Sequence, residues 1–118
     1  MDQVKKSIQQ GSKLILGGNH EQCNFQPTLI DFVDCNNIAF KEETFGPVAT
    51  IIRVKDENDA IAFANNHRYG LAATIWTEDH ENAYHLARKL EAGTIFVNAM
   101  VRSDSTPPLW RDKKIRLW

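Results

Sequence analysis

Two thiols, Cys23 and Cys35, are the side chains best suited to nucleophilic or metal chemistry. Neither belongs to a CxxC pair. His20 precedes Cys23 by three residues, but no further ligand follows at the spacing of a zinc site. A disulfide framework is not expected in a chain of this kind. We therefore interpret both thiols as structural or incidental, and the sequence predicts no metal site.

A second pair of side chains that could bind a ligand is Arg102-Ser103, near the end of the chain. A guanidinium and a hydroxyl both donate hydrogen bonds to a carboxylate, and arginine can do so with two parallel bonds. The alternative is an ordinary solvated loop, in which such a pair has no ligand. The pair is thus a hypothesis for the recognition of an acidic substrate.

The bulk properties indicate one small globular domain. The chain has 118 residues, of which 42% are hydrophobic and 25% charged, and its formal net charge is −1. Such a balance gives no electrostatic reason to expect nucleic acid or an anionic membrane as a partner. No apolar run has membrane-spanning length, and no signal-peptide core follows the N-terminus. The expected compartment is the cytoplasm.

The elements that must position these residues alternate between strands and helices. Asp56 and Asp79 each precede a segment with helical apolar spacing, so both are predicted N-caps. Gly93 is a predicted left-handed cap of the second of these helices, and residues 19–26 are a predicted loop. The expected elements are helices at 2–10, 57–66 and 80–92, and strands at 14–16, 27–30, 48–54, 71–76 and 94–97. The 48–54 strand is expected to be buried.

This order predicts an α/β fold with a largely parallel sheet, because strands separated by helices pair in parallel. It also gives the context for a resemblance. The segment EETFGPV at residues 42–48 resembles the EExFGPV motif of the aldehyde dehydrogenase superfamily. GG at 17–18 and PTL at 27–29 precede it, and NHRYGL at 66–71 and GTIFVN at 93–98 follow, in the order and spacing of that family.

The resemblance covers residues 1–104 and implies the C-terminal part of an aldehyde dehydrogenase catalytic domain: a partial α/β domain, mostly parallel sheet with flanking helices. It implies that a cysteine thiolate attacks the aldehyde, hydride passes to NAD or NADP, and activated water releases the acid. In the family Glu43 would accept hydrogen bonds from the nicotinamide ribose, and Phe45 would pack against the nicotinamide. Alone, Glu43 would be interpreted as a solvated loop acid and Phe45 as a core aromatic.

The string FVNAMVRSD at residues 96–104 resembles the succinate-semialdehyde dehydrogenase branch. This resemblance implies that Ala99 to Ser103 line the substrate entrance and that Arg102 and Ser103 bind the distal carboxylate of the substrate. Asn98 would lie near the reaction centre. The alternative for Asn98 is a buried amide whose hydrogen bonds are all satisfied.

Several parts that the family requires are missing from the 118 residues. The nucleophile and the general base would both lie upstream of Met1, and Cys23 and Cys35 do not stand in the nucleophile's motif. No GxGxxG or GxxxxG marks a dinucleotide-binding domain. We therefore expect the isolated chain to oxidise no aldehyde and to bind no cofactor. The alternative is a non-catalytic binding or assembly module that docks on a full-length relative.

The tail at residues 105–118, STPPLWRDKKIRLW, departs from the PRLPFGGIKKSGYG that the branch would have. Read one nucleotide later, suitable codons for the tail give that family sequence, and the TGG codons of Trp110 and Trp118 force two of its glycines. We interpret the tail as out of frame after a single-base insertion near the Asp104 codon. The alternative is a nucleic-acid or membrane patch, because basic residues and tryptophans are interleaved.

An out-of-frame tail would be disordered or packed opportunistically. The family is homo-oligomeric, and its subunit-joining strand, which would follow PFGG, is missing here. Apolar surfaces are then expected to lie uncovered, which favours self-association.

Overall fold

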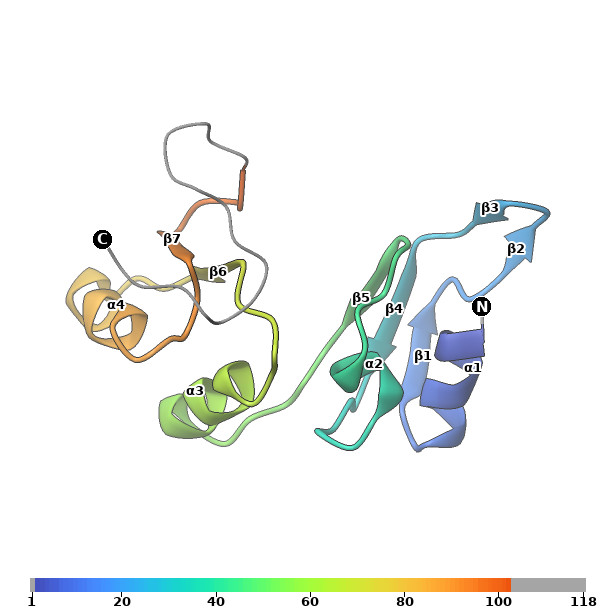
Figure 1. Cartoon of the computed structure of the whole chain (residues 1–118), viewed down its shortest axis with the longest axis horizontal. Coiled ribbons are helices and arrows are strands. Elements are labelled where there is room, and N and C mark those ends of the chain that lie inside the picture. Colours follow the sequence, from blue (N-terminus) through green and yellow to red (C-terminus); the bar gives the residue numbers. More distant parts are fainter. Residues whose placement is uncertain (1, 103–118) are drawn as a thin grey trace. The chain divides into compact units, whose positions relative to one another are not determined.

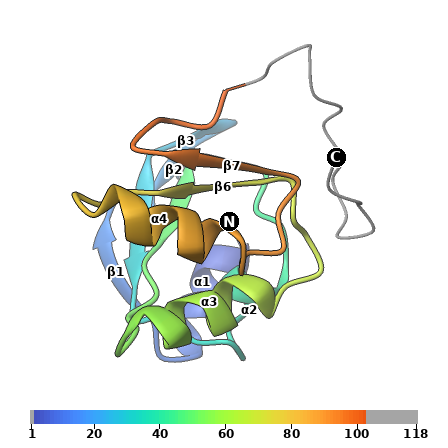
Figure 2. The same cartoon turned by 90° about the vertical axis from the view of Figure 1, so that its left-hand side faces the viewer.

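The computed structural model describes residues 2–102. The chain divides between Val54 and Lys55 into an N-terminal and a C-terminal unit, and each is a compact structure of its own. Figures 1 and 2 show the elements of both units. The tail at 105–118 and Ser103 lie outside the described residues, so the interpretations placed on them stay predictions.

The N-terminal unit combines two helices with a three-stranded sheet and a small hairpin. Its elements are α1 (Asp2–Gln9), β1 (Lys13–Leu16), β2 (His20–Glu21), β3 (Asn24–Phe25), β4 (Thr28–Asp31), α2 (Ile38–Lys41) and β5 (Val48–Thr50). The sheet has the order β1-β4-β5. β1 pairs antiparallel with β4, and β4 pairs in parallel with β5, from Thr28 opposite Val48 to Ile30 opposite Thr50. The parallel pair contains α2 in its crossover connection.

The core of this unit lies between α1 and the central strand β4. Val4 on α1, Ile30 on β4 and Val33 are buried together. Four partly buried hydrophobic residues pack against them: Phe25, Phe40, Val48 and Ile52. Figure 1 shows β4 with β1 on one side and β5 on the other. The central strand is therefore the best covered, and its residues alternate little because both faces are packed.

The C-terminal unit consists of two helices and one pair of parallel strands. Its elements are α3 (Glu57–Asn65), β6 (Ala72–Ile75), α4 (His80–Ala87) and β7 (Thr94–Val97). β6 and β7 pair in parallel in a register that runs from Ala72 opposite Thr94 to Ile75 opposite Val97. Helix α4 connects the two strands, and Figure 2 shows it beside them. Ala83 on α4 is the fully buried hydrophobic residue of this unit among the described residues.

The predicted fold class is confirmed: helices flank sheets, and the two pairs joined by a helical crossover, β4–β5 and β6–β7, are parallel. Two further pairs, β1–β4 and β2–β3, are antiparallel. The two predicted N-caps, Asp56 and Asp79, are also confirmed. The side chain of Asp56 accepts from the Asp59 N–H, and that of Asp79 accepts from the Asn82 N–H. None of the helices within residues 2–102 is long and apolar enough to cross a membrane.

Three local predictions were wrong, and one short helix was missed. Residues 19–26 contain the β2–β3 hairpin, which forms because Gln22 adopts a left-handed φ of 52° at the turn. The 48–54 strand is limited to Val48–Thr50, and Ala49 and Thr50 are exposed rather than buried. Their exposure follows from the position of β5 at an edge of the sheet in this unit. The short helix α2 was not predicted at all.

The third error concerns Gly93. Helix α4 already ends at Ala87, and hydrogen bonds of the i to i+3 type, from Lys89 N to Leu86 O and from Leu90 N to Ala87 O, close its last turn. Gly93 does not adopt a positive φ. Its N–H instead donates to the carbonyl of Gly70 at 2.8 Å, at the start of the β6–β7 pairing.

Candidate functional site

The loop that connects α2 to β5 carries Glu43 and Phe45. It starts at Glu42, the C-cap of α2, whose backbone turns to an extended conformation and whose N–H still donates to Ile38 O. It ends at a tight turn in which Val48 N donates to Gly46 O at 2.8 Å. Thr28 N donates to Pro47 O at 2.8 Å and ties this end to β4. The loop is therefore fixed at both ends by backbone hydrogen bonds.

The two predicted cofactor contacts both project from this loop at the surface of the unit. Phe45 is 84% exposed, and Glu43 is also exposed. A core role for Phe45 is therefore ruled out in this structure. An aromatic ring that is mostly exposed on a fixed loop can pack against a planar group. The neighbouring carboxylate can accept hydrogen bonds from two adjacent hydroxyls.

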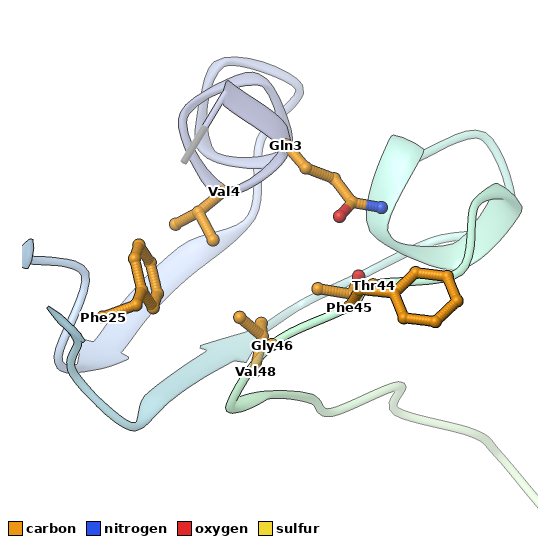
Figure 3. Close-up of a pocket in the computed structure, with 7 residues that line it drawn as sticks. All are labelled: Gln3, Val4, Phe25, Thr44, Phe45, Gly46 and Val48. Carbon is orange, nitrogen blue, oxygen red and sulfur yellow. The ribbon is translucent and has the colours of Figure 1, made fainter. Parts of the chain in front are cut away.

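A small pocket lies beside the loop in the N-terminal unit (Figure 3). Its volume is about 190 Å³. It is lined by residues of α1, β3, the loop and β5: Gln3, Val4, Phe25, Thr44, Phe45, Gly46 and Val48. Figure 3 shows Phe25 and Phe45 on opposite sides of it. Since pockets for drug-sized ligands measure about 300–1,000 Å³, this one can take only part of a ligand.

Three of the sequence motifs meet in this unit. Gly17 has a φ of +74°, and a Cβ there would lie 2.1 Å from the carbonyl oxygen of Pro27, so only glycine fits. Gly18 N donates to the hydroxyl of Thr28 at 2.8 Å. Thr28 in turn holds Pro47. The GG, PT and FGP motifs thus form one chain of contacts that ends at the loop.

Asn98 lies at the surface of the C-terminal unit, and its expected place near the reaction centre stays a prediction. It is exposed, has a φ of 49°, and follows β7 directly. Its amide forms two reciprocal bonds with Thr77: Thr77 N donates to Oδ1 at 2.9 Å, and Nδ2 donates to Thr77 O at 2.7 Å. The amide is satisfied, as one reading predicted, but it is not buried. It extends the strand pairing by one step beyond Ile75 and Val97.

Arg102 is exposed and belongs to the C-terminal unit, whereas Glu43 and Phe45 belong to the N-terminal unit. Its predicted partner Ser103 lies outside the described residues. The thiols are free, with Cys23 exposed and Cys35 half-buried. Within residues 2–102 no cluster of three or more potential ligands could hold a metal ion.

The strongest electrostatic pair of the N-terminal unit joins Asp31 and Arg53. Arg53 Nη2 lies 2.5 Å from Asp31 Oδ2, and Nε lies 3.1 Å from Oδ1, so the contact is bidentate. The hydrogen bond from Arg53 lowers the pKa of Asp31, and the same bond raises the pKa of Arg53. Phe32, which has a φ of 57°, donates its N–H to Asp31 and lies under the guanidinium, 4.6 Å from ring centroid to Cζ. This pair fixes the strand end rather than a reaction centre.

The site residues missed by sequence reasoning are Gln3 and Thr44, which line the pocket beside Phe45. Gln3 precedes Phe45 by more than forty positions in the sequence. No local pattern marks it, because its relevance arises from the packing of α1 against α2. Thr44 lies inside the EETFGPV motif, which could have indicated it.

The profile of the Aldehyde dehydrogenase family matches residues 1–109, which is most of the chain. The chain belongs to this family. A lactaldehyde dehydrogenase of Methanococcus maripaludis (strain C5) is 42% identical over 106 residues, which cover 88% of this chain and 23% of that protein. The succinate semialdehyde dehydrogenase [NAD(P)+] Sad of Escherichia coli (strain K12) is 41% identical over 106 residues, covering 87% of this chain and 23% of that enzyme.

Solved structures of family members contain the same fold. The NADP-dependent glyceraldehyde-3-phosphate dehydrogenase of Bacillus halodurans C-125, in complex with NADP, superposes with a TM-score of 0.88 at 36% identity. The match covers 95% of this chain and 24% of that enzyme. This aldehyde dehydrogenase chain therefore spans about a quarter of the length of the relatives it matches. The family and fold shown for this chain correspond to one segment of those longer relatives.

Proposed function

We propose that this chain is a segment of an NAD(P)-dependent aldehyde dehydrogenase, in which it contributes contacts to the cofactor. The observation that carries the proposal is the exposed Phe45 beside Glu43 on a loop fixed at both ends. This loop stands within EETFGPV, inside the region that matches the family profile. The whole enzyme would oxidise an aldehyde to the corresponding carboxylic acid.

The residues present fit the nicotinamide half of the cofactor. Glu43 would accept hydrogen bonds from the two ribose hydroxyls, and its exposure leaves it accessible to them. Phe45 would pack its exposed ring against the nicotinamide and orient it. The cofactor, when bound, supplies the acceptor for the hydride of the aldehyde. The contribution of this chain is binding and orientation, which raise the rate by fixing the reacting geometry.

For the substrate we propose a short aldehyde with a distal carboxylate, of which succinate semialdehyde is the first to test. Arg102 and Ser103 would bind that carboxylate through charge-assisted hydrogen bonds. The exposure of Arg102 and the similarity to the succinate semialdehyde dehydrogenase of Escherichia coli support this choice. Lactaldehyde is the natural comparison substrate, because relatives of similar identity carry that name.

A chimera would test the cofactor contact. Residues 1–102 would replace the matching segment of the Escherichia coli enzyme, with which this chain shares 41% identity. Glu43→Gln should lower kcat/KM for NAD(P) by about tenfold to a hundredfold, since a hydrogen bond to a charged group contributes about 1.5–3 kcal/mol. Glu42→Gln is the matched control, because Glu42 is the adjacent exposed acid. Equal effects of the two substitutions would contradict the assignment.

We further propose that the isolated 118-residue chain is not catalytic and binds no cofactor by itself. It contains neither the nucleophile nor the general base that the family uses, and without them no transition state is stabilised. Purified chain mixed with succinate semialdehyde or lactaldehyde and NAD(P) should give no cofactor reduction above background. Reduction that scales with the concentration of the chain would overturn this proposal.

The alternative role is a non-catalytic module that docks on a full-length relative. This role is favoured by large apolar side chains that are more than half exposed, because such side chains often mark a docking surface. They include Leu16, Phe45, Trp76 and Met100. Co-purification of the tagged chain with an intact aldehyde dehydrogenase from its own source would support this role. Absence of the complex, at concentrations where the chain stays monomeric, would count against it.

The reading frame of the tail has a separate test. If residues 105–118 are out of frame, the nucleotide sequence after the Asp104 codon must encode PRLPFGGIKKSGYG or a close variant in the shifted frame. Sequencing of this stretch and its flanks measures that directly. Codons that give an unrelated peptide in the shifted frame would eliminate the insertion.

A further inference from the structure

One face of helix α1 is polar, and it faces α2. Gln3, Ser7 and Gln10 follow one another at intervals of four and three residues, the spacing that aligns side chains along one side of a helix. All three make hydrogen bonds to α2 or to its caps. α2 has only four residues and is far too short to be stable by itself. Its position must therefore come from such contacts.

The contacts hold both ends of α2. At the start, the side-chain oxygen of Gln10 accepts from Ile38 N at 2.8 Å, and Ser7 Oγ donates to Asn37 Oδ1 at 2.7 Å. At the end, Gln3 Nε2 donates to the carbonyl oxygen of Glu42 at 3.2 Å. The Glu42 carbonyl belongs to the peptide that joins it to Glu43. A side chain of α1 thus contacts the backbone at the point where the loop begins.

The start of α2 is held rigidly by a buried polar network. Asn37 is 1% exposed and caps α2 by accepting from Ala39 N. Its Nδ2 donates to Ser7 O at 3.0 Å and to Ser12 Oγ at 2.7 Å. Ser7 and Ser12 are also buried, and Ser7 Oγ lies 3.1 Å from Ser12 Oγ. A buried network whose members are all satisfied permits one arrangement of α1 against α2.

Gln3 also borders the loop on the side of the pocket. It lines the pocket together with Thr44, Phe45 and Gly46 (Figure 3). Gln3 therefore borders the loop in two ways, through its hydrogen bond to the Glu42 carbonyl and as a lining residue of the same pocket. Because the Ser7–Asn37 bond anchors α1 against α2, the position of Gln3 relative to the loop is fixed.

We propose that Gln3 is a positioning residue that fixes the backbone from which Glu43 and Phe45 project, with the Ser7–Asn37 network as its anchor. The proposal rests on the function proposed above for Glu43 and Phe45. Gln3 touches no reacting atom and acts through the Glu42 peptide. Its loss should loosen the loop without unfolding the unit, because its hydrogen bond is exposed and the core residues are untouched.

The test uses the 118-residue chain and backbone ¹⁵N order parameters, which need no cofactor. Gln3→Met removes the donor at nearly constant size, and Gln3→Glu removes it without added apolar surface. Both should lower the order parameters of residues 43–46 from about 0.85 towards the value of about 0.6 that marks flexible backbone. Those of β1 and β4 should not change. Gln9→Met is the matched control, since Gln9 is an exposed glutamine of the same helix.

Wild-type order parameters at residues 43–46 in either Gln3 variant would overturn the proposal, as would an equal loss in Gln9→Met. A uniform loss across the unit would also overturn it, because it would show a general structural role. A wild-type chain whose amide spectrum is not dispersed would also overturn the proposal, since the bond from Gln3 to Glu42 would then not exist in solution. The proposed function is tested separately by Glu43→Gln in the chimera, so failure of one leaves the other standing.

Discussion

At the scale of single residues, Asp31 and Arg53 determine how the N-terminal unit responds to pH. Asp31 is 4% exposed and accepts from Arg53 and from Phe32 N, and these bonds favour its charged form. Its pKa in the folded chain is accordingly below the ordinary value of about 3.9. The pair therefore stabilises the folded state above the ordinary pKa, and this stabilisation is lost as the pH falls through the lowered pKa.

We predict that Arg53→Gln lowers the stability of this unit at pH 7 and flattens its dependence on pH between about pH 5 and pH 2. The reason is that Asp31 loses the partner that lowers its pKa. Urea unfolding at a series of pH values measures both effects. Lys5→Gln, which removes an exposed cation of the same unit, should preserve the wild-type pH dependence. If the stability of Arg53→Gln fell as steeply with decreasing pH as that of the wild type, other carboxylates would determine the pH dependence.

Asn98 combines a strained backbone with a satisfied side chain. Asn98→Ala should lower the free energy of unfolding of the C-terminal unit by about 2 kcal/mol, because it loses both bonds to Thr77 and keeps the left-handed φ. Asn98→Gly should lower it by about 1 kcal/mol, since glycine tolerates that φ. Denaturant unfolding, followed at amides of β6 and β7, measures the difference. Equal effects would mean that the backbone conformation contributes little.

At the scale of elements, the helix caps differ in what surrounds them. Asp79 caps α4 at an exposed site, whereas Asn37 caps α2 inside the buried network with Ser7 and Ser12. Removal of an exposed cap side chain loses only its hydrogen bond to the helix N-terminus. Removal of Asn37 also breaks its buried hydrogen bonds with Ser7 and Ser12, which carries an additional cost.

We predict that Asp79→Ala costs about 1 kcal/mol and Asn37→Ala about 2–4 kcal/mol. The free energy of unfolding should be measured separately for each unit by hydrogen exchange, because the two caps lie in different units. Asp56→Ala, the cap of α3, is a second exposed case and should resemble Asp79→Ala. A small effect of Asn37→Ala would imply that water replaces its amide in the network.

At the scale of the whole molecule, little apolar surface is buried. Four hydrophobic residues among positions 2–102 are buried: Val4, Ile30, Val33 and Ala83. Many large apolar side chains are exposed instead, with Leu16 at 62%, Trp76 at 65% and Met100 at 78%. A monomeric domain seldom exposes so many of them, so these surfaces favour association.

We predict that the isolated chain self-associates as its concentration rises, as measured by sedimentation velocity. Leu16→Lys together with Trp76→Arg should lower the weight-average mass at a given concentration, because each replaces an exposed apolar side chain with a cation. Gln9→Lys is the control for added charge, since it removes no large apolar group. A monomer that remains stable at every concentration would contradict the prediction.

The sequence alone determined the family, the α/β class, and the caps at Asp56 and Asp79, because these depend on motifs and on local spacing. It also singled out Glu43 and Phe45 within EETFGPV, although their position on a loop came only from the structure. It missed α2, because four residues without a helical apolar pattern form a helix only when α1 holds them. It also misplaced the cap at Gly93, because a glycine after a helix can equally begin a strand.

Only the tertiary structure decided how the motifs meet. Gly17 is required because the backbone of Pro27 passes against it, and the Gly93 N–H bonds to the Gly70 carbonyl across more than twenty positions of sequence. Gln3, which no local pattern marks, contacts the loop of Phe45 because α1 packs on α2. Spacing along the chain fixes which residues share a helix face or a strand, while contacts between distant segments depend on packing. For that reason the fold class could be predicted from the sequence, and the residues that support the loop of Glu43 and Phe45 could not.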